Sequence, residues 1–180
     1  RDSGAGMIRQ FVVVPPVPAL LPRYRSSIDP VADLRASALD VVAAMTRDAE
    51  EVSILGSDRF AGAVGRALLA GAGYEGRVTR EAPVALVMAN GSAMRSEKAP
   101  GHLDDRAFDF DDAVDLALRS GDPLRLSALD AMLGTELWAS GIDTLRDLGQ
   151  HLTGSWRVSV PHADAPYGVL WWVCAWVRAD

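Results

Sequence analysis

The alternation of apolar and polar positions along the chain predicts short strands separated by amphipathic helices. Apolar or alternating runs rich in β-branched residues are typical of strands, and they cover residues 8–14, 52–55, 83–89, 156–160 and 168–177. Apolar positions that recur every three or four residues predict helices, which fall at 29–45, 60–70, 105–119, 122 onward, 132–140 and 143–152. Strands that alternate with helices are typical of a mostly parallel or mixed sheet with helices on both faces. The predicted fold class is therefore α/β.

Two Asp-Pro pairs mark predicted helix starts. Asp29-Pro30 and Asp122-Pro123 each place an aspartate where it can cap a helix and a proline at the first helical position. In the clearest helix, residues 105–119, apolar positions form one face and acidic positions the other. We interpret the acidic residues as a solvated face rather than a calcium site, because they lack the central glycine and terminal glutamate of a calcium loop. They are Asp104, Asp105, Asp109, Asp111, Asp112 and Asp115.

Composition indicates a globular protein with one domain. The chain has 180 residues, of which 49% are hydrophobic and 23% charged, and its net charge is -6. This length is enough to bury a sizeable core, and the acidic balance argues against a nucleic-acid partner. We expect one domain over residues 7–180 and interpret residues 1–6, before Met7, as a cloning remnant. Lys98 is the only lysine among 18 basic residues, which is typical of GC-rich bacterial coding.

The cysteine content and the short apolar segments predict a cytoplasmic protein that does not enter a membrane. Cys174 has no partner for an internal disulfide and lies in an apolar run, so the chain shows no adaptation to an oxidising compartment. The apolar residues 11–21 contain three prolines, unlike the core of a signal peptide. Residues 168–177 are about half the ~20 residues that a membrane helix needs.

Two of the three histidines are candidates for general acid–base catalysis. His102 precedes a predicted helix and His162 lies in a proline-rich segment that we predict to be a loop between two strands. Asp104 and Asp164 follow them by two residues and could orient the rings. The alternative is that both are exposed loop histidines. His151 falls at a predicted helix end, and we assign it no function.

The loop after the third long strand, residues 90–101, is the best candidate for ligand binding. Ligands in open α/β sheets bind beyond the carboxyl ends of the strands. This loop offers a glycine that allows close approach of the backbone, together with donors for an anion or a carbonyl group. The candidate residues are Asn90, Gly91, Ser92, Arg95 and Lys98. The alternative is a polar surface loop whose charged residues, Arg95, Glu97 and Lys98, pair with each other.

The same loop carries a resemblance to a known family. Residues 90–114, from Asn90-Gly-Ser-Ala-Met-Arg-Ser-Glu-Lys to Phe-Asp-Phe-Asp-Asp-Ala-Val114, and Ser120-Gly-Asp-Pro-Leu124 resemble the subunit-B-like (LigB-type) class III extradiol dioxygenases. Residues 12–22 and 164–170 resemble the same family, so the likeness spans most of the chain, as in a divergent actinobacterial member. The family's fold is an α/β sandwich around a central sheet. The segment near Arg59 is shorter than in the family, as if a loop were missing.

The resemblance implies a non-haem Fe(II) site that this chain lacks. Active members hold the iron with two histidines and a glutamate and cleave catechol rings with O₂, a ligand set that leaves open positions for substrate and oxygen. Where the family has its first histidine this chain reads Val14-Pro-Pro-Val17, and where it has the second the chain reads Gly56-Ser-Asp-Arg59. Residues 167–180 contain no glutamate, and Gly91-Ser-Ala-Met-Arg95 lacks the family's acid–base histidine.

Three hypotheses follow from these absences. The first, which we prefer because a shared fold does not transfer function without the site residues, is a pseudoenzyme without a cofactor that binds a small molecule or a protein partner. The second is a metal-dependent enzyme acting on an aromatic or other small substrate, with Fe(II) held by substituted ligands from His102, Asp104, His162 and Asp164. The third is a structural subunit that supports an active partner, or a homo-oligomer, and uses tryptophans as interface anchors, although core packing is their default role.

Overall fold

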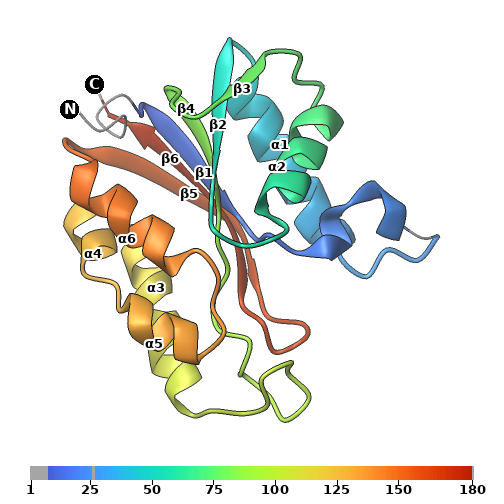
Figure 1. The fold of residues 1–180 in the computed structure, drawn as a ribbon, viewed down its shortest axis with the longest axis vertical. Coiled ribbons are helices and arrows are strands. Elements are labelled where there is room, and N and C mark those ends of the chain that lie inside the picture. Colours follow the sequence, from blue (N-terminus) through green and yellow to red (C-terminus); the bar gives the residue numbers. More distant parts are fainter. Residues whose placement is uncertain (1–7, 26, 180) are drawn as a thin grey trace.

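The computed structural model describes residues 8–25 and 27–179 and shows one mixed sheet with helices on both faces (Figure 1). This confirms the α/β class predicted from the hydrophobic pattern. Residues 1–6, interpreted as a cloning remnant, lie outside the described residues. Within the described ranges, no helix has the length and apolarity needed to cross a membrane.

Six strands form the sheet in the order β3-β2-β4-β1-β6-β5. The strands β3, β2, β4 and β1 are parallel, whereas β6 runs antiparallel to β1 and β5 antiparallel to β6. The carboxyl ends of the four parallel strands therefore lie at one edge of the sheet. The strand bounds are β1 Gln10–Val14, β2 Glu51–Leu55, β3 Arg77–Thr79, β4 Val84–Met88, β5 Trp156–Asp164 and β6 Trp171–Arg178.

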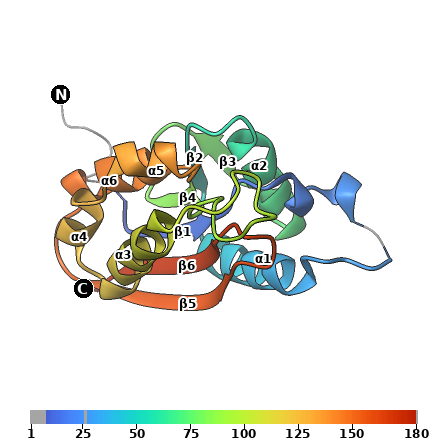
Figure 2. The ribbon, with the colours of Figure 1, turned by 90° about the horizontal axis from the view of Figure 1, so that it is seen from below.

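The described residues form six α-helices, which divide between the two faces of the sheet. Helices α1 and α2 pack on one face, and α3, α4, α5 and α6 pack on the other (Figures 1 and 2). Two short 3₁₀ turns, Pro18–Leu20 and Pro22–Tyr24, follow β1. The helix bounds are α1 Ala32–Thr46, α2 Ala61–Gly71, α3 Arg106–Ser120, α4 Pro123–Ser127, α5 Ala131–Glu136 and α6 Ile142–His151.

The two Asp-Pro pairs behave differently. Asp122 caps α4 as predicted, since its side chain accepts a hydrogen bond from the backbone N–H of Leu124. Helix α1 begins at Ala32, later than predicted, because Asp29 caps a preceding turn at the backbone N–H of Val31. The other carboxylate oxygen of Asp29 accepts from Arg35 Nε at 2.7 Å. This buried arginine also donates to the carbonyl oxygens of residues 19 and 20 and so ties the β1–α1 connection to the helix.

Alternate residues of each central strand supply two separate cores. In β1, Phe11 and Val13 face α3–α6, and Val12 faces α1 and α2. Phe11 packs between two tryptophans, with ring centroids 5.8 Å from Trp156 and 5.2 Å from Trp176. Aromatic contacts of this kind stabilise a core beyond the area that they bury.

The last two strands hold one correction to the prediction. The predicted strand 156–160 continues to Asp164, so His162 and Asp164 lie on β5 and not in a loop. The pairing of β5 with β6 shifts register between Ser159 and His162, and Pro161 lies in this bulge. Proline lacks the N–H that a regular ladder needs, and it is tolerated at bulges and edge strands. Because β5 is both an edge strand and bulged, Pro161 does not end it.

Candidate functional site

At the carboxyl edge of the parallel strands, where the family resemblance would place iron, the segment after β4 pairs with the segment before α6. Asn90 follows β4 and forms an isolated antiparallel bridge with Ser140, whose carbonyl accepts from Asn90 N at 3.0 Å. Ser140 Oγ in turn donates to Asp58 Oδ2 at 3.2 Å. Next to this bridge, Gly141 has a φ of 73°, and a Cβ there would collide with the carbonyl oxygen of Met88. Glycine is needed at this position because the two segments approach so closely.

The residues at this edge do not fit an Fe(II) site. Buried Pro15 and Pro16 follow β1, and Ser57 and Asp58 lie after β2, so no imidazole is present there. Across the described residues, no group of three or more histidine, cysteine, aspartate or glutamate side chains is placed to hold a metal ion. The substituted ligands His102, Asp104, His162 and Asp164 are therefore not gathered at one point.

A buried aspartate anchors the start of the 90–101 loop. Asp111 is fully buried and accepts three hydrogen bonds, from Ser92 N at 2.7 Å, from Ser92 Oγ at 2.7 Å and from Arg95 Nη1 at 2.9 Å. The prediction of a solvated face is thus wrong for Asp111. Its position explains the burial, because it lies four residues after Ala107 and three before Val114 on the apolar face of α3.

The donors that the sequence assigns to a ligand are largely engaged by the protein itself. Asn90 is buried and its side chain donates to the carbonyl of Gly91 at 2.9 Å. Gly91 N donates to Leu170 O at 2.7 Å. Arg95 binds Asp111, and its guanidinium also lies 4.8 Å from the centroid of the Phe108 ring. The proposed pairing of Arg95 within the loop is therefore replaced by a contact to α3, while Lys98 is exposed.

His102 is exposed, and its neighbouring carboxylate is engaged elsewhere. Its Nδ1 lies 3.4 Å from the carbonyl oxygen of Glu97. Asp104 instead accepts hydrogen bonds from the guanidinium of Arg106, at 2.8 Å from Nη2. These hydrogen bonds hold the pKa of Asp104 below its ordinary value. Asp104 therefore pairs with Arg106 at the start of α3 rather than with His102.

His162 and Asp164 do lie together, at a small pocket beside the start of α1. This pocket has a volume of about 160 Å³ and is lined by residues 29–34, His162, Asp164, Pro166 and Trp171. Asp164 Oδ1 accepts a hydrogen bond from the next backbone N–H, that of Ala165, at 2.8 Å. His162 and Asp164 therefore line one pocket, which has room for only a very small ligand.

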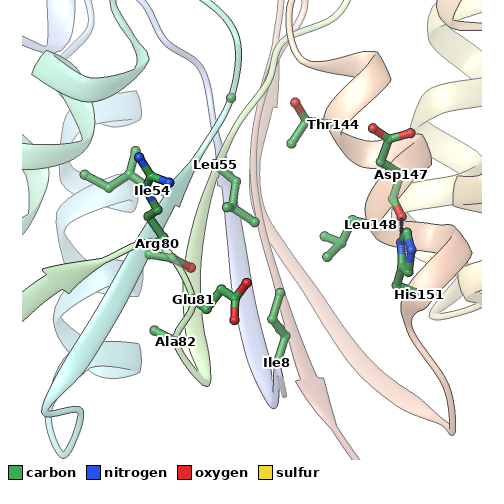
Figure 3. Close-up of a pocket in the computed structure, with 12 residues that line it drawn as sticks. Ile8, Ile54, Leu55, Arg80, Glu81, Ala82, Thr144, Asp147, Leu148 and His151 are labelled. Carbon is green, nitrogen blue, oxygen red and sulfur yellow. Dashed lines mark hydrogen bonds between the residues drawn. The ribbon is translucent and has the colours of Figure 1, made fainter. Parts of the chain in front are cut away.

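A larger groove, missed by the sequence analysis, lies between α6 and the segment that joins β3 to β4 (Figure 3). We call it the α6 groove. It encloses about 410 Å³. Because β3 and β4 flank β2 in the sheet, residues 80–83 must cross β2, and they form one wall of the groove. Its lining residues are Ile8, Ser53, Ile54, Leu55, Gly56, Arg80, Glu81, Ala82, Thr144, Asp147, Leu148 and His151.

The floor of the α6 groove is mainly apolar and contains one buried serine, Ser53. Leu55 packs with the core under α3–α6, and Ile54 packs with the opposite core. Since side chains alternate along a strand, Ser53 faces the groove with Leu55. Ser53 is only 2% exposed, and it lines the groove.

The α6 wall brings a histidine to the groove. His151 ends α6, as predicted, and its Nδ1 lies 2.7 Å from the carbonyl oxygen of Asp147. No short motif could have revealed this site, because its walls come from four separate stretches of the chain. These stretches become neighbours only because the fold places α6 opposite the segment that crosses β2.

Comparisons with known proteins leave the family open. A scan against models of protein families finds no match to this chain, and a search of curated proteins finds none. The α/β fold is a finding of the structure, and the likeness to the dioxygenase family stays a prediction from the residues quoted above.

Proposed function

We propose that this chain is a dioxygenase-like pseudoenzyme that binds a small molecule in the α6 groove. The observation that carries the proposal is the groove itself, with its volume of about 410 Å³, its apolar floor and its few polar groups. Small-molecule sites are typically concave, largely apolar and of roughly 300–1,000 Å³.

The proposal that iron chemistry is lost is supported by the residues at the carboxyl edge. An iron facial triad needs two imidazoles and a carboxylate converging on open positions. Here prolines follow β1, and Asp58, after β2, accepts a hydrogen bond from Ser140. The segment after β4 is held by the backbone bridge between Asn90 and Ser140.

The third hypothesis, a structural subunit anchored through tryptophans, receives less support. Four of the five tryptophans are buried in the fold, and the fifth, Trp138, is 57% exposed. Interface anchors are large side chains that reach a partner's pocket. One exposed tryptophan offers little of the surface that the hypothesis requires.

Metal analysis of protein purified without chelator tests the loss of iron. We expect far less than one iron per chain and no oxygen consumption when Fe(II) and catechol are added. Near-stoichiometric iron that is lost on His102→Ala or His162→Ala would overturn the proposal and favour the enzyme with substituted ligands.

A thermal-shift screen of small molecules tests binding in the groove. Thr144→Trp places a large ring on the groove wall, and Gln150→Trp places the same ring on an exposed position of α6 outside the groove. Ligands of the groove should stabilise the parent protein and the Gln150→Trp variant but not the Thr144→Trp variant. Ligands that stabilise all three proteins equally bind elsewhere and count against the proposed site.

A further inference from the structure

The two walls of the α6 groove each present a carboxylate. Glu81 lies on the segment that crosses β2, and Asp147 lies on α6. Figure 3 shows the carboxylate of Glu81 pointing into the space between the walls, toward α6. In the described residues neither carboxylate has an ion-pair partner or a side-chain hydrogen bond. Ionised carboxylates can only accept hydrogen bonds, so both carboxylates favour a ligand with donors.

The arginine that lines the groove is directed away from α6. Arg80 is next to Glu81 in the chain, but its guanidinium lies beside Ile54, on the side away from α6 (Figure 3). The open space between the crossing segment and α6 is therefore bordered by two negative charges. An anionic ligand would be repelled there, and a cationic one attracted.

The remaining polar side chains of the groove add an acceptor and two hydroxyls. A carbonyl oxygen only accepts, so the 2.7 Å contact of His151 Nδ1 with Asp147 O requires that Nδ1 carry the proton. In the neutral ring Nε2 is then an acceptor. The hydroxyls of Ser53 and Thr144, which also line the groove, can accept or donate.

We propose that the α6 groove binds a small organic cation, an amine with an apolar body. The ammonium group would meet the carboxylates of Glu81 and Asp147, and the hydrocarbon or aromatic body would cover Leu55, Leu148 and Ile8. An ammonium carries three donors and no acceptor, which matches a border of acceptors. This inference rests on the proposed function as a ligand-binding protein and names the chemistry of its ligand.

Calorimetric titration with three matched probes tests the charge preference. The probes are 2-phenylethylamine, its neutral analogue 2-phenylethanol and the anion 3-phenylpropanoate, which share one aromatic body. We expect the amine to bind about fivefold or more tightly than the alcohol, and the anion most weakly, because exposed ion pairs contribute up to about 1 kcal/mol each. The preference for the amine should shrink as salt is added.

Two variants and one control test the placement. Glu81→Gln and Asp147→Asn each remove one charge with little change of shape, and each should weaken amine binding about fivefold. Asp40→Asn removes an exposed aspartate from α1, on the other face of the sheet, and should leave binding unchanged. Circular dichroism confirms that each variant keeps the parent fold.

The outcomes separate this inference from the proposed function. Equal binding of the three probes, or amine affinity that is unaffected by both Glu81→Gln and Asp147→Asn, overturns the cation proposal. If a neutral or anionic molecule binds and Thr144→Trp blocks it, the groove remains a ligand site and only its ligand chemistry is wrong. Stoichiometric iron or catechol cleavage instead overturns the pseudoenzyme proposal, whatever the probes do.

Discussion

Asp111 shows how one side chain can hold a long loop on a helix. Its carboxylate accepts two hydrogen bonds from Ser92 and one from Arg95, in a position without solvent exposure. Removing one partner of a buried pair leaves the others unpaired, at a cost of about 3–5 kcal/mol. We expect Asp111→Ala to lower the free energy of unfolding by that amount, measured by urea denaturation.

The adjacent residue provides the control for this prediction. Asp112 is exposed on the same helix, and Asp112→Ala should change stability by less than about 0.5 kcal/mol. If the two variants are equally stable, the loop is held by other contacts and Asp111 is not its anchor.

The Asp29–Arg35 pair makes stability depend on pH. The hydrogen bond from Arg35 holds the pKa of Asp29 below its ordinary value of 3.8. A group whose pKa is lowered by folding contributes stability above its unfolded pKa, and this contribution is lost as pH falls through the folded pKa. Thermal unfolding between about pH 5 and pH 2 should show a smaller loss of Tm in Asp29→Asn than in the parent. An identical acid profile for both proteins would contradict this role.

At the residue scale the sequence predicted the burial of apolar side chains better than the partners of polar ones. The helical spacing of Ala107 and Val114 already placed position 111 on the buried face, but the acidic identity of Asp111 outweighed that pattern. Its partners, Ser92 and Arg95, are 19 and 16 residues away. Partners at such distances depend on how the loop folds back, which periodicity does not encode.

Among the secondary-structure elements, the contact between α6 and β4 depends on Gly141. Its φ of 73° is in the left-handed region, and its α-hydrogen faces the carbonyl of Met88 at the carboxyl end of β4. Gly73 has a similar φ of 75°, but a Cβ there meets no atom within 4 Å. Both alanine variants incur the left-handed penalty of about 1–2 kcal/mol. We expect Gly141→Ala to be less stable than Gly73→Ala by at least a further ~1 kcal/mol in denaturant unfolding.

Equal stability of these two variants would show that α6 can move away from β4 at little cost. In that case the α6 groove would also change width easily, and its proposed ligand contacts would be less well defined.

At the element scale the apolar runs predicted the six described helices and five of the strands, because burial on one or both faces fixes the spacing of apolar residues. Strand β3 was not predicted, because its three residues are largely exposed and form no apolar run. The prediction ended β5 at Val160 rather than at Asp164, because a bulge on an edge strand has no local sequence signal. The α6 groove was not predicted, because nothing in the local sequence distinguishes Glu81 and Asp147 from other exposed acidic residues. Only the fold places them on opposite walls of one groove.

For the molecule as a whole, the reactivity of the buried Cys174 thiol reports global unfolding. It lies on β6, between β1 and β5, and burial raises the pKa of its thiol to about 12. Only the thiolate reacts rapidly with disulfide reagents. We expect no reaction with Ellman's reagent in the folded protein at pH 8 and one reacted thiol per chain in urea.

The reaction rate at intermediate urea concentrations should follow the free energy of global unfolding. A thiol that reacts rapidly without denaturant would show that the β1–β6 pair separates in the folded state, contrary to its central place in the sheet.

The pairing of β1 with β6 also shapes how a ribosome-bound chain can fold. β1 ends at Val14, and its antiparallel neighbour begins at Trp171, so one edge of the nascent parallel sheet stays open through most of synthesis. Contacts this distant in sequence form slowly, and an unpaired apolar edge can recruit other chains. We therefore expect emerging chains to depend on chaperones that shield Phe11 and Val13 until translation has passed Arg178.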